Sequence, residues 1–158
     1  PRVYPNVVVM RTLSKAWGAA GLRLGAVIAA PQFLTALDRV RAPYPIPAVV
    51  ADKALEHLNQ FAMEKAVQDV LCESDWLSEE LRRKGRARQV RPSATNFILV
   101  EPYGQASDMV RYLASQQVLI RDRSRRPQLD NFVRITIGTR EENLLLLRAW
   151  DRRDRRMA

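Results

Sequence analysis

The longest stretch of this sequence without a helix-breaking residue does most to limit the possible folds. From residue 48 to residue 84 there is neither proline nor glycine, and apolar side chains recur every three or four residues, as on one face of a helix. Three prolines between residues 43 and 47 exclude a helix directly before this stretch, and Gly85 is a suitable C-cap directly after it. The sequence therefore predicts one long helix or two consecutive helices over residues 48–84.

Two short apolar runs lie before this helical stretch. Residues 7–10 and residues 26–30 are continuously apolar, which is typical of buried parallel strands. Pro31 suits the first turn of a helix, and Leu34 and Leu37 are spaced to share one of its faces. We interpret this order as strand, crossover and strand at the edge of an α/β layer.

The residues after Gly85 alternate between strand and helix patterns. They predict strands over 96–100, around 119 and over 132–137, and a helix over 106–115. A final helix is expected to begin at Thr139, because Thr-Arg-Glu-Glu is a capping box. This order predicts a small α+β lobe with an antiparallel or mixed sheet.

The side chains of the strand over 132–137 alternate in character. One face of the strand carries Val133, Ile135 and Ile137, which should be buried. The other face carries Phe132, Arg134 and Thr136. Arg134 can therefore reach a cleft while its apolar neighbours anchor the strand.

The composition is that of a globular chain: 47% of the residues are apolar and 27% are charged. No apolar run approaches the roughly 20 residues that cross a bilayer, so we expect a cytoplasmic protein without a membrane partner. Cys72 and His57 are the single cysteine and the single histidine. They exclude an intrachain disulfide and disfavour a metal site, and Cys72 is expected to pack as a small apolar residue.

The net charge of +9 favours anionic partners, and most of the 26 cations are arginines. They gather in three clusters, over residues 82–91, 121–126 and 152–156. We expect the first and the last cluster to be solvated, because they fall at helix ends or in loops. A nucleic-acid site would interleave aromatic residues or form a recognisable module, and neither is evident, so nucleic acid is not an expected partner.

The segment with the most chemical information is Arg11-Thr-Leu-Ser-Lys-Ala-Trp-Gly-Ala-Ala-Gly-Leu-Arg-Leu-Gly25. It places a serine, a lysine and an arginine on a glycine-rich connection directly after a predicted strand, where open α/β sheets bind ligands. From position alone, Lys15 is a phosphate contact, a solvated charge or an amine nucleophile towards a carbonyl.

The pattern Ser-Lys-Ala-x-Gly-x-x-Gly-x-Arg-x-Gly closely resembles the lysine segment of fold-type I aminotransferases, which use pyridoxal 5'-phosphate. The resemblance implies that Lys15 is the catalytic residue that forms a Schiff base with the coenzyme. It also implies that Ser14 and Arg23 bind the coenzyme phosphate, a task suited to the planar guanidinium fork. The three glycines of the pattern are expected to serve backbone geometry: Gly18, Gly21 and Gly25.

Two motifs in the C-terminal part of the chain narrow the choice among families with this lysine segment. Phe132-Val-Arg-Ile-Thr-Ile-Gly-Thr-Arg-Glu-Glu-Asn143 and Arg91-Pro-Ser-Ala-Thr-Asn-Phe-Ile-Leu-Val100 resemble motifs of the histidinol-phosphate aminotransferases. The resemblance implies that Arg134 clamps a substrate carboxylate or phosphate and that Arg121 is a second contact. The alternatives are a salt bridge across the sheet for Arg134 and a surface loop cation for Arg121.

The resemblance also implies an organisation and a reaction. Residues 1–47 would be a remnant of the large coenzyme-binding α/β domain, 48–84 connecting helices and 85–158 the small α+β domain. The substrates would be histidinol phosphate and glutamate or 2-oxoglutarate, and the longer parent would be a homodimer. Residues 1–158 alone are expected to bind the coenzyme weakly or not at all.

Four other interpretations remain open at this stage. The lysine segment is shared by aromatic aminotransferases and by threonine-phosphate decarboxylase. A regulatory protein with an aminotransferase-like lobe and a basic nucleic-acid-binding module are candidates from other classes.

Overall fold

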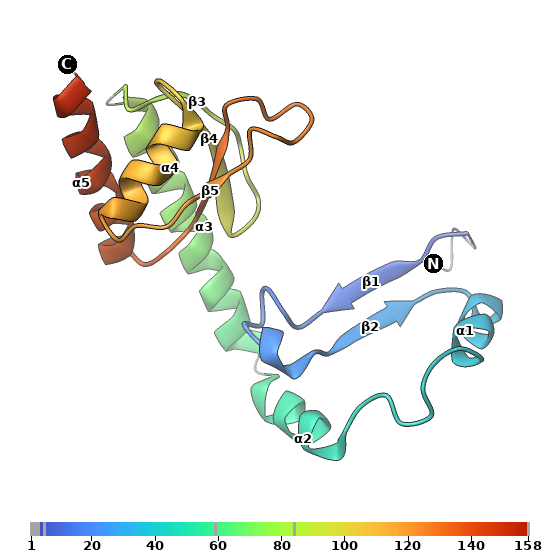
Figure 1. The fold of residues 1–158 in the computed structure, drawn as a ribbon. Helices are drawn as coiled ribbons and strands as arrows, with labels where there is room; N and C mark the ends of the chain where they lie inside the picture. Colours follow the sequence, from blue (N-terminus) through green and yellow to red (C-terminus); the bar gives the residue numbers. More distant parts are fainter. Residues whose placement is uncertain (1–3, 5, 59, 84, 158) are drawn as a thin grey trace. The chain divides into compact units, whose positions relative to one another are not determined.

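The segments on the two sides of the long helical stretch each build a sheet of their own (Figure 1). The computed structural model describes residues 4, 6–58, 60–83 and 85–157. The chain divides into two units, residues 1–66 and 67–158. The assignment of three domains with limits at 47 and 84 stays a prediction.

The elements of the first unit are β1 (Val9–Thr12), the 3₁₀ helix η1 (Ala20–Leu22), β2 (Gly25–Ile28), α1 (Pro31–Asp38) and α2 (Ala48–His57). Helix α3 (Gln60–Arg83) continues into the second unit. There the elements are β3 (Ala87–Val90), β4 (Phe97–Pro102), α4 (Ala106–Ser115), β5 (Arg121–Asp122), β6 (Val133–Thr136) and α5 (Arg140–Met157). Among the described residues, none of these helices has both the length and the apolar composition of a membrane span.

The proline-free and glycine-free stretch forms two consecutive helices, α2 and α3, as predicted. Gly85 ends α3 with φ of 60°, a left-handed conformation that glycine adopts without strain. Its N–H donates to the carbonyl of Arg82 at 3.1 Å, and the N–H of Arg86 donates to the carbonyl of Leu81 at 3.2 Å. These two bonds are the Schellman pattern, so the C-cap prediction is confirmed.

Strands β1 and β2 pair antiparallel, with Val9 opposite Ile28 and Thr12 opposite Gly25. The prediction of parallel strands joined by a crossover is therefore wrong. The N–H of Leu13 donates to the carbonyl of Leu24 at 3.2 Å, so the ladder extends into a connection that turns back on itself. A continuous apolar run indicates a strand but does not give its direction, which depends on the partner strand.

The second unit contains a four-stranded antiparallel sheet with the order β3-β4-β6-β5. An antiparallel or mixed sheet was expected for this region, but the prediction missed β3 and placed β5 around residue 119.

One face of the sheet contributes Ile98, Val100, Val133 and Ile135 to the core, and α3, α4 and α5 contribute Leu77, Leu81, Met109, Leu113 and Trp150. Helices therefore cover this face of the sheet.

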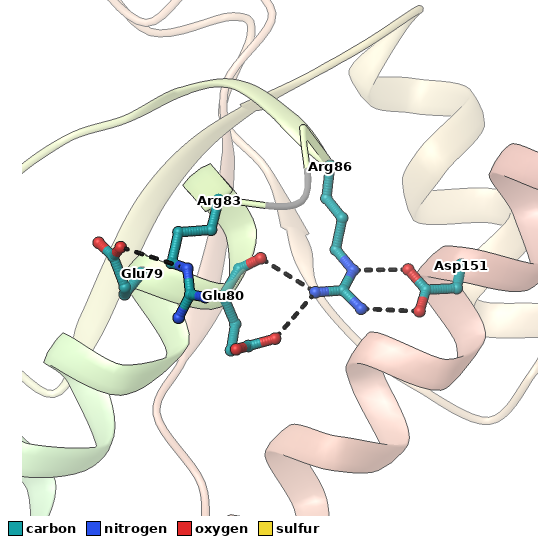
Figure 2. Close-up of polar contacts among 5 residues, drawn as sticks. All are labelled: Glu79, Glu80, Arg83, Arg86 and Asp151. Atoms are coloured by element: carbon teal, nitrogen blue, oxygen red, sulfur yellow. Dashed lines mark hydrogen bonds and ion pairs between the residues drawn. The ribbon is translucent and has the colours of Figure 1, made fainter.

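Arg86 lies in the first basic cluster, which was expected to be solvated, but it is only 6% exposed. Figure 2 shows how its guanidinium is satisfied: Nε and Nη2 donate to the two carboxylate oxygens of Asp151 at 2.5 and 2.7 Å. Nη1 donates to the carbonyl and the carboxylate of Glu80 at 2.9 and 3.2 Å. The Asp151 hydrogen bonds raise the pKa of Arg86 against the effect of burial. A buried arginine held this way joins the last turn of α3 and the middle of α5 to the start of β3.

Two further expectations on single residues are wrong. Arg153, in the third basic cluster, is buried, and its Nη1 donates to the carbonyl of Tyr103 at 3.3 Å. Cys72 is exposed on α3, because it lies on the face of the helix away from the core. Lys84 and the side chains of Arg155 and Arg156 lie outside the described residues.

The Arg86 network makes a prediction about stability. Asp151→Ala leaves a buried guanidinium with one carboxylate partner, and because Asp151 itself is partly exposed we expect a loss of about 2 kcal/mol in the free energy of unfolding. Glu79→Ala is the matched control, because it removes a carboxylate from an exposed ion pair on α3, in which Arg83 Nε lies 3.9 Å from Glu79 Oε1 (Figure 2). The control should change the stability by less than about 0.5 kcal/mol. Urea unfolding followed by circular dichroism measures both, and equal effects would contradict the role given to Asp151.

Candidate functional site

The lysine segment forms the connection between β1 and β2, over residues 13–24. Lys15 is exposed and begins a tight turn, in which the N–H of Gly18 donates to the carbonyl of Lys15 at 2.8 Å. Gly18 has φ of 64°, a left-handed conformation that glycine adopts at a lower cost than other residues. The turn leaves the amine of Lys15 accessible from solvent.

Ser14 is oriented by Thr12 at the end of β1. The N–H of Ser14 donates to Thr12 Oγ1 at 3.1 Å, and the hydroxyl of Thr12 donates to Ser14 Oγ at 2.8 Å. Because Ser14 Oγ accepts in this bond, its own proton is available for an anion. Thr12 was not among the residues predicted for the site, and the available signal was its spacing of two from Ser14, which is typical of hydroxyl turns.

Arg23 directly follows η1 and adopts a left-handed conformation with φ of 53°. Its Nη1 donates to the carbonyl of Ala20 at 3.0 Å, which leaves most of the guanidinium donors for other partners. Ser14, Lys15 and Arg23 thus lie on one connection. A hydroxyl and a guanidinium can donate to a phosphate and an amine can react with an aldehyde, so this set fits a group that has both.

Helix α2 supports the connection from within the same unit. His57 Nε2 lies 2.5 Å from the carbonyl oxygen of Trp17, two residues after Lys15. His57 was weighed above only as a metal ligand, so this contact was not predicted. Among the described residues, no group of three histidine, cysteine or acidic side chains is placed to hold a metal ion.

Gly25 is packed against the backbone of β1. A Cβ at this position would lie 2.8 Å from the carbonyl oxygen of Arg11, a distance that real side chains do not adopt. Gly21 differs, since no heavy atom lies within 4 Å of the corresponding position and its φ is not positive. The hairpin that carries the lysine segment therefore depends on Gly25.

Arg134 and Arg121 lie in the second unit, on neighbouring strands. They are directly opposite each other in the ladder between β6 and β5. Arg134 is partly buried, and its guanidinium lies over the ring of Phe97 at 5.2 Å from the centroid. Burial lowers the pKa of Arg134, and the positive charges of Arg121 and Arg123 lower it further. Arg121 is exposed and lies in β5, not in a loop.

The guanidinium of Arg134 keeps a hydrogen-bond donor that no group in the described part of the chain accepts from. Its Nε is buried and has no hydrogen-bond partner in the described part of the chain. Within the same part, no acidic side chain forms an ion pair with Arg134. The alternative of a salt bridge across the sheet is therefore not observed, and a buried donor of this kind is suited to an anionic ligand.

The turn after β6 is held by the residues that follow Arg134 in the C-terminal motif. Thr139 and Glu142 form the predicted capping box, with bonds of 2.8 and 3.3 Å between side chains and backbone N–H groups. The buried side chain of Asn143 accepts from the N–H of Gly138 and donates to its carbonyl. It also donates to Glu73 at 3.0 Å, which ties the turn to α3. These contacts fix the end of the strand that carries Arg134.

The structure thus groups the predicted residues in two sets. The first set, Ser14, Lys15 and Arg23, lies on one connection in residues 1–66. The second set, Arg121 and Arg134, lies on adjacent strands in residues 67–158.

The family model of aminotransferase class I and II matches residues 2–149, and the chain belongs to this family. A histidinol-phosphate aminotransferase of Parabacteroides distasonis is 40% identical over 147 residues, which are 92% of this chain and 42% of that relative. The chain therefore spans about two fifths of the length of the curated relative.

Two solved structures extend this similarity. The histidinol-phosphate aminotransferase of Sinorhizobium meliloti, in complex with pyridoxal-5'-phosphate, is 28% identical with a TM-score of 0.84, and the match covers 98% of this chain and 42% of that one. The L-threonine-O-3-phosphate decarboxylase of Porphyromonas gingivalis is 28% identical with a TM-score of 0.72, and the match covers 93% of this chain and 46% of that one.

The packing of Gly25 predicts an effect on the hairpin. Gly25→Ala places a methyl group against the backbone of β1, so we expect the free energy of opening of the hairpin to fall by about 1 to 3 kcal/mol. Gly21→Ala is the control, because the space around Gly21 is open and the change should be nearly neutral. Hydrogen exchange of the N–H of Leu13, which bonds to Leu24, measures the opening. Equal exchange in the two variants would contradict the close approach at Gly25.

Proposed function

We propose that these 158 residues form part of a histidinol-phosphate aminotransferase. The enzyme would transfer the amino group of histidinol phosphate to 2-oxoglutarate and release imidazole-acetol phosphate and glutamate. The observation that carries the proposal is that both sets of site residues fall within the span that is 40% identical to the relative from Parabacteroides distasonis. A cytoplasmic location and a homodimeric assembly remain predictions.

Lys15 is proposed as the catalytic residue of this chain. Its amine, Nζ, is exposed on the connection and can bind the aldehyde of pyridoxal 5'-phosphate. When bound, this coenzyme supplies an electron-withdrawing ring that accepts the electron pair released at the substrate carbon. Lys15 Nζ would take the proton from that carbon and return a proton later in the reaction, acting as general base and then as general acid.

Ser14 and Arg23 are proposed to hold the coenzyme phosphate. The bonds described above do not use the proton of Ser14 Oγ or the remaining guanidinium donors of Arg23, so both side chains can bind an anion. Charge-assisted hydrogen bonds of this kind are about twice as strong as neutral ones, and the arginine stays charged at any working pH. Both residues therefore anchor the phosphate while Lys15 remains free for proton transfer.

Arg134 and Arg121 are proposed to bind the anionic group of the substrate. The enzyme must accept glutamate in one half of the reaction and a phosphate monoester without an α-carboxylate in the other. A guanidinium recognises both anions through parallel N–H donors. The buried Nε of Arg134, without a partner among the described residues, supports this role.

Other groups of the site would come from parts of the relatives to which this chain does not align. The chain spans about two fifths of those relatives, so the site it carries is incomplete. We therefore expect the isolated 158 residues to bind pyridoxal 5'-phosphate weakly and to show no robust transamination.

The role of Lys15 can be tested in the full-length protein that contains these residues. Lys15→Ala should lower the rate of transamination by about a thousandfold or more, because both the covalent contact and the proton carrier are lost. Lys53→Ala is the control, since Lys53 is an exposed lysine paired with Glu56 at 2.6 Å on α2. After reduction with borohydride in the presence of pyridoxal 5'-phosphate, mass spectrometry should find the label on Lys15 and not on Lys53. An unlabelled Lys15 would refute the proposed chemistry.

A second candidate is a decarboxylase of threonine phosphate, which the similarity to the Porphyromonas gingivalis structure supports. The amino donor distinguishes the candidates. Histidinol phosphate should yield glutamate from 2-oxoglutarate, with a kcat/KM at least about tenfold above that for phenylalanine, because the phosphate gains charge-assisted bonds from the arginines. Release of carbon dioxide from threonine phosphate without glutamate formation would favour the second candidate. Faster turnover of phenylalanine would favour an aromatic aminotransferase.

A further inference from the structure

The sheet of the second unit has one apolar face and one cationic face. Val133 and Ile135 of β6 are buried under the helices, so the side chain of Arg134 between them belongs to the opposite face. Arg121 is directly opposite Arg134 in the ladder, which places it on the same face. The cationic face therefore contains at least these two arginines.

Arg123 extends this face. Its N–H donates to the carbonyl of Phe132 at 2.9 Å, so the ladder between β5 and β6 continues for one more step. Residues two apart on a strand share a face, which puts Arg123 beside Arg121 and diagonal to Arg134. The electrostatic effect agrees with this placement, because the charges of Arg121 and Arg123 both lower the pKa of Arg134.

The three positive charges are not neutralised by the protein. Among the described residues, none of the three arginines forms an ion pair with an acidic side chain. The nearest carboxylate along the chain, Asp122, accepts hydrogen bonds from the N–H and the hydroxyl of Ser124, and these bonds lower its pKa. Like charges placed opposite each other destabilise a strand pair, so a bound anion would relieve the repulsion.

The number of donors matches one class of anion. A carboxylate has two oxygens, which two guanidinium groups can bind. A phosphate monoester has three terminal oxygens and carries a second negative charge above a pKa of about 6. A third guanidinium can therefore bind the third oxygen of the phosphate and lie near its second negative charge, and a carboxylate has neither.

We propose that Arg123 is a third contact in the anion site of Arg121 and Arg134, and that it determines the preference of this site for a doubly charged phosphate monoester over a carboxylate. The inference rests on the proposed function only in that Arg121 and Arg134 receive the anionic group of the substrate. Arg123 adds selectivity between the two anions that the reaction must accept.

A competing location for an anion lies next to this face. Arg123 also lines an open hollow of about 440 Å³ together with Asp122, Arg125 and Arg126. An anion in the hollow would depend on Arg126 and not on Arg134. Arg126→Gln, which removes the same charge from the same loop, is therefore the matched control.

The test is a calorimetric titration of the full-length protein that contains these residues, loaded with pyridoxal 5'-phosphate so that the proposed coenzyme phosphate site is filled, at pH 8 and constant ionic strength, with methyl phosphate and with acetate as probes. Arg123→Gln should weaken methyl phosphate binding about tenfold and acetate binding less than about twofold, whereas Arg126→Gln should leave the ratio of the two affinities unchanged. An equal loss for both probes in Arg123→Gln, or an equal loss of methyl phosphate in Arg126→Gln, would overturn the inference.

Two further measurements separate the inference from its basis and from a folding defect. If Arg134→Gln and Arg121→Gln leave methyl phosphate binding intact, the proposed substrate site is wrong. If they weaken it and Arg123→Gln does not, only the role of Arg123 fails.

In the unaltered protein, the preference for methyl phosphate over methanesulfonate, a singly charged anion with three oxygens, should fall when the pH is lowered from 8 to 5, where the ester loses its second charge. A preference that does not change with pH would count against selection by charge.

Discussion

The buried guanidinium of Arg86 is the interaction on which the second unit depends. A charge with 6% exposure is stable only if carboxylates and carbonyls surround it, and here they come from Glu80 on α3 and Asp151 on α5. The side chain of Trp150 adds a bond of 2.9 Å to the carbonyl of Arg86. The two helices are thereby held at one end of β3, and their apolar sides cover one face of the sheet. This packing leaves Arg134 and Arg121 on the opposite face of the sheet.

The two faces of the sheet show how the same strand serves stability and chemistry. Val133 and Ile135 enter the core, while Arg134, at the alternating position, belongs to the opposite face, and its buried Nε has no hydrogen-bond partner in the described part of the chain. The antiparallel register then decides which residues join it, because β5 brings Arg121 opposite and the next ladder step brings Arg123. These like charges repel one another and lower the stability of the strand pair, and an anion bound beside them would offset the repulsion.

In the first unit, the short connection between β1 and β2 carries three polar side chains. An antiparallel hairpin brings both ends of the connection together, with the N–H of Leu13 bonded to the carbonyl of Leu24. Ser14 and Arg23 thus lie near the two ends of one closed loop, and Lys15 lies in the turn that Gly18 makes possible. Thr12 and His57 hold this loop through a hydroxyl and a ring nitrogen. One closed loop therefore carries a hydroxyl, an amine and a guanidinium.

The sequence alone determined the features that depend on neighbouring residues. Helical periodicity over 48–84, the glycine cap at Gly85 and the capping box at Thr139 act within a few residues, so their patterns are visible in the chain itself. The spacing of Ser14, Lys15 and Arg23 is also visible in the sequence itself, because all three lie on one short connection.

Only the tertiary structure decided the features that need a distant partner. The antiparallel pairing of β1 with β2 was hidden, because an apolar run does not specify direction. The burial of Arg86 was hidden because its partner Asp151 is 65 residues away, and a run of arginines looks solvated until such a partner is known. The sequence could identify Arg121 and Arg134 one by one, but the register of β5 against β6 was needed to place Arg123 beside them, because strand pairing depends on long-range contacts.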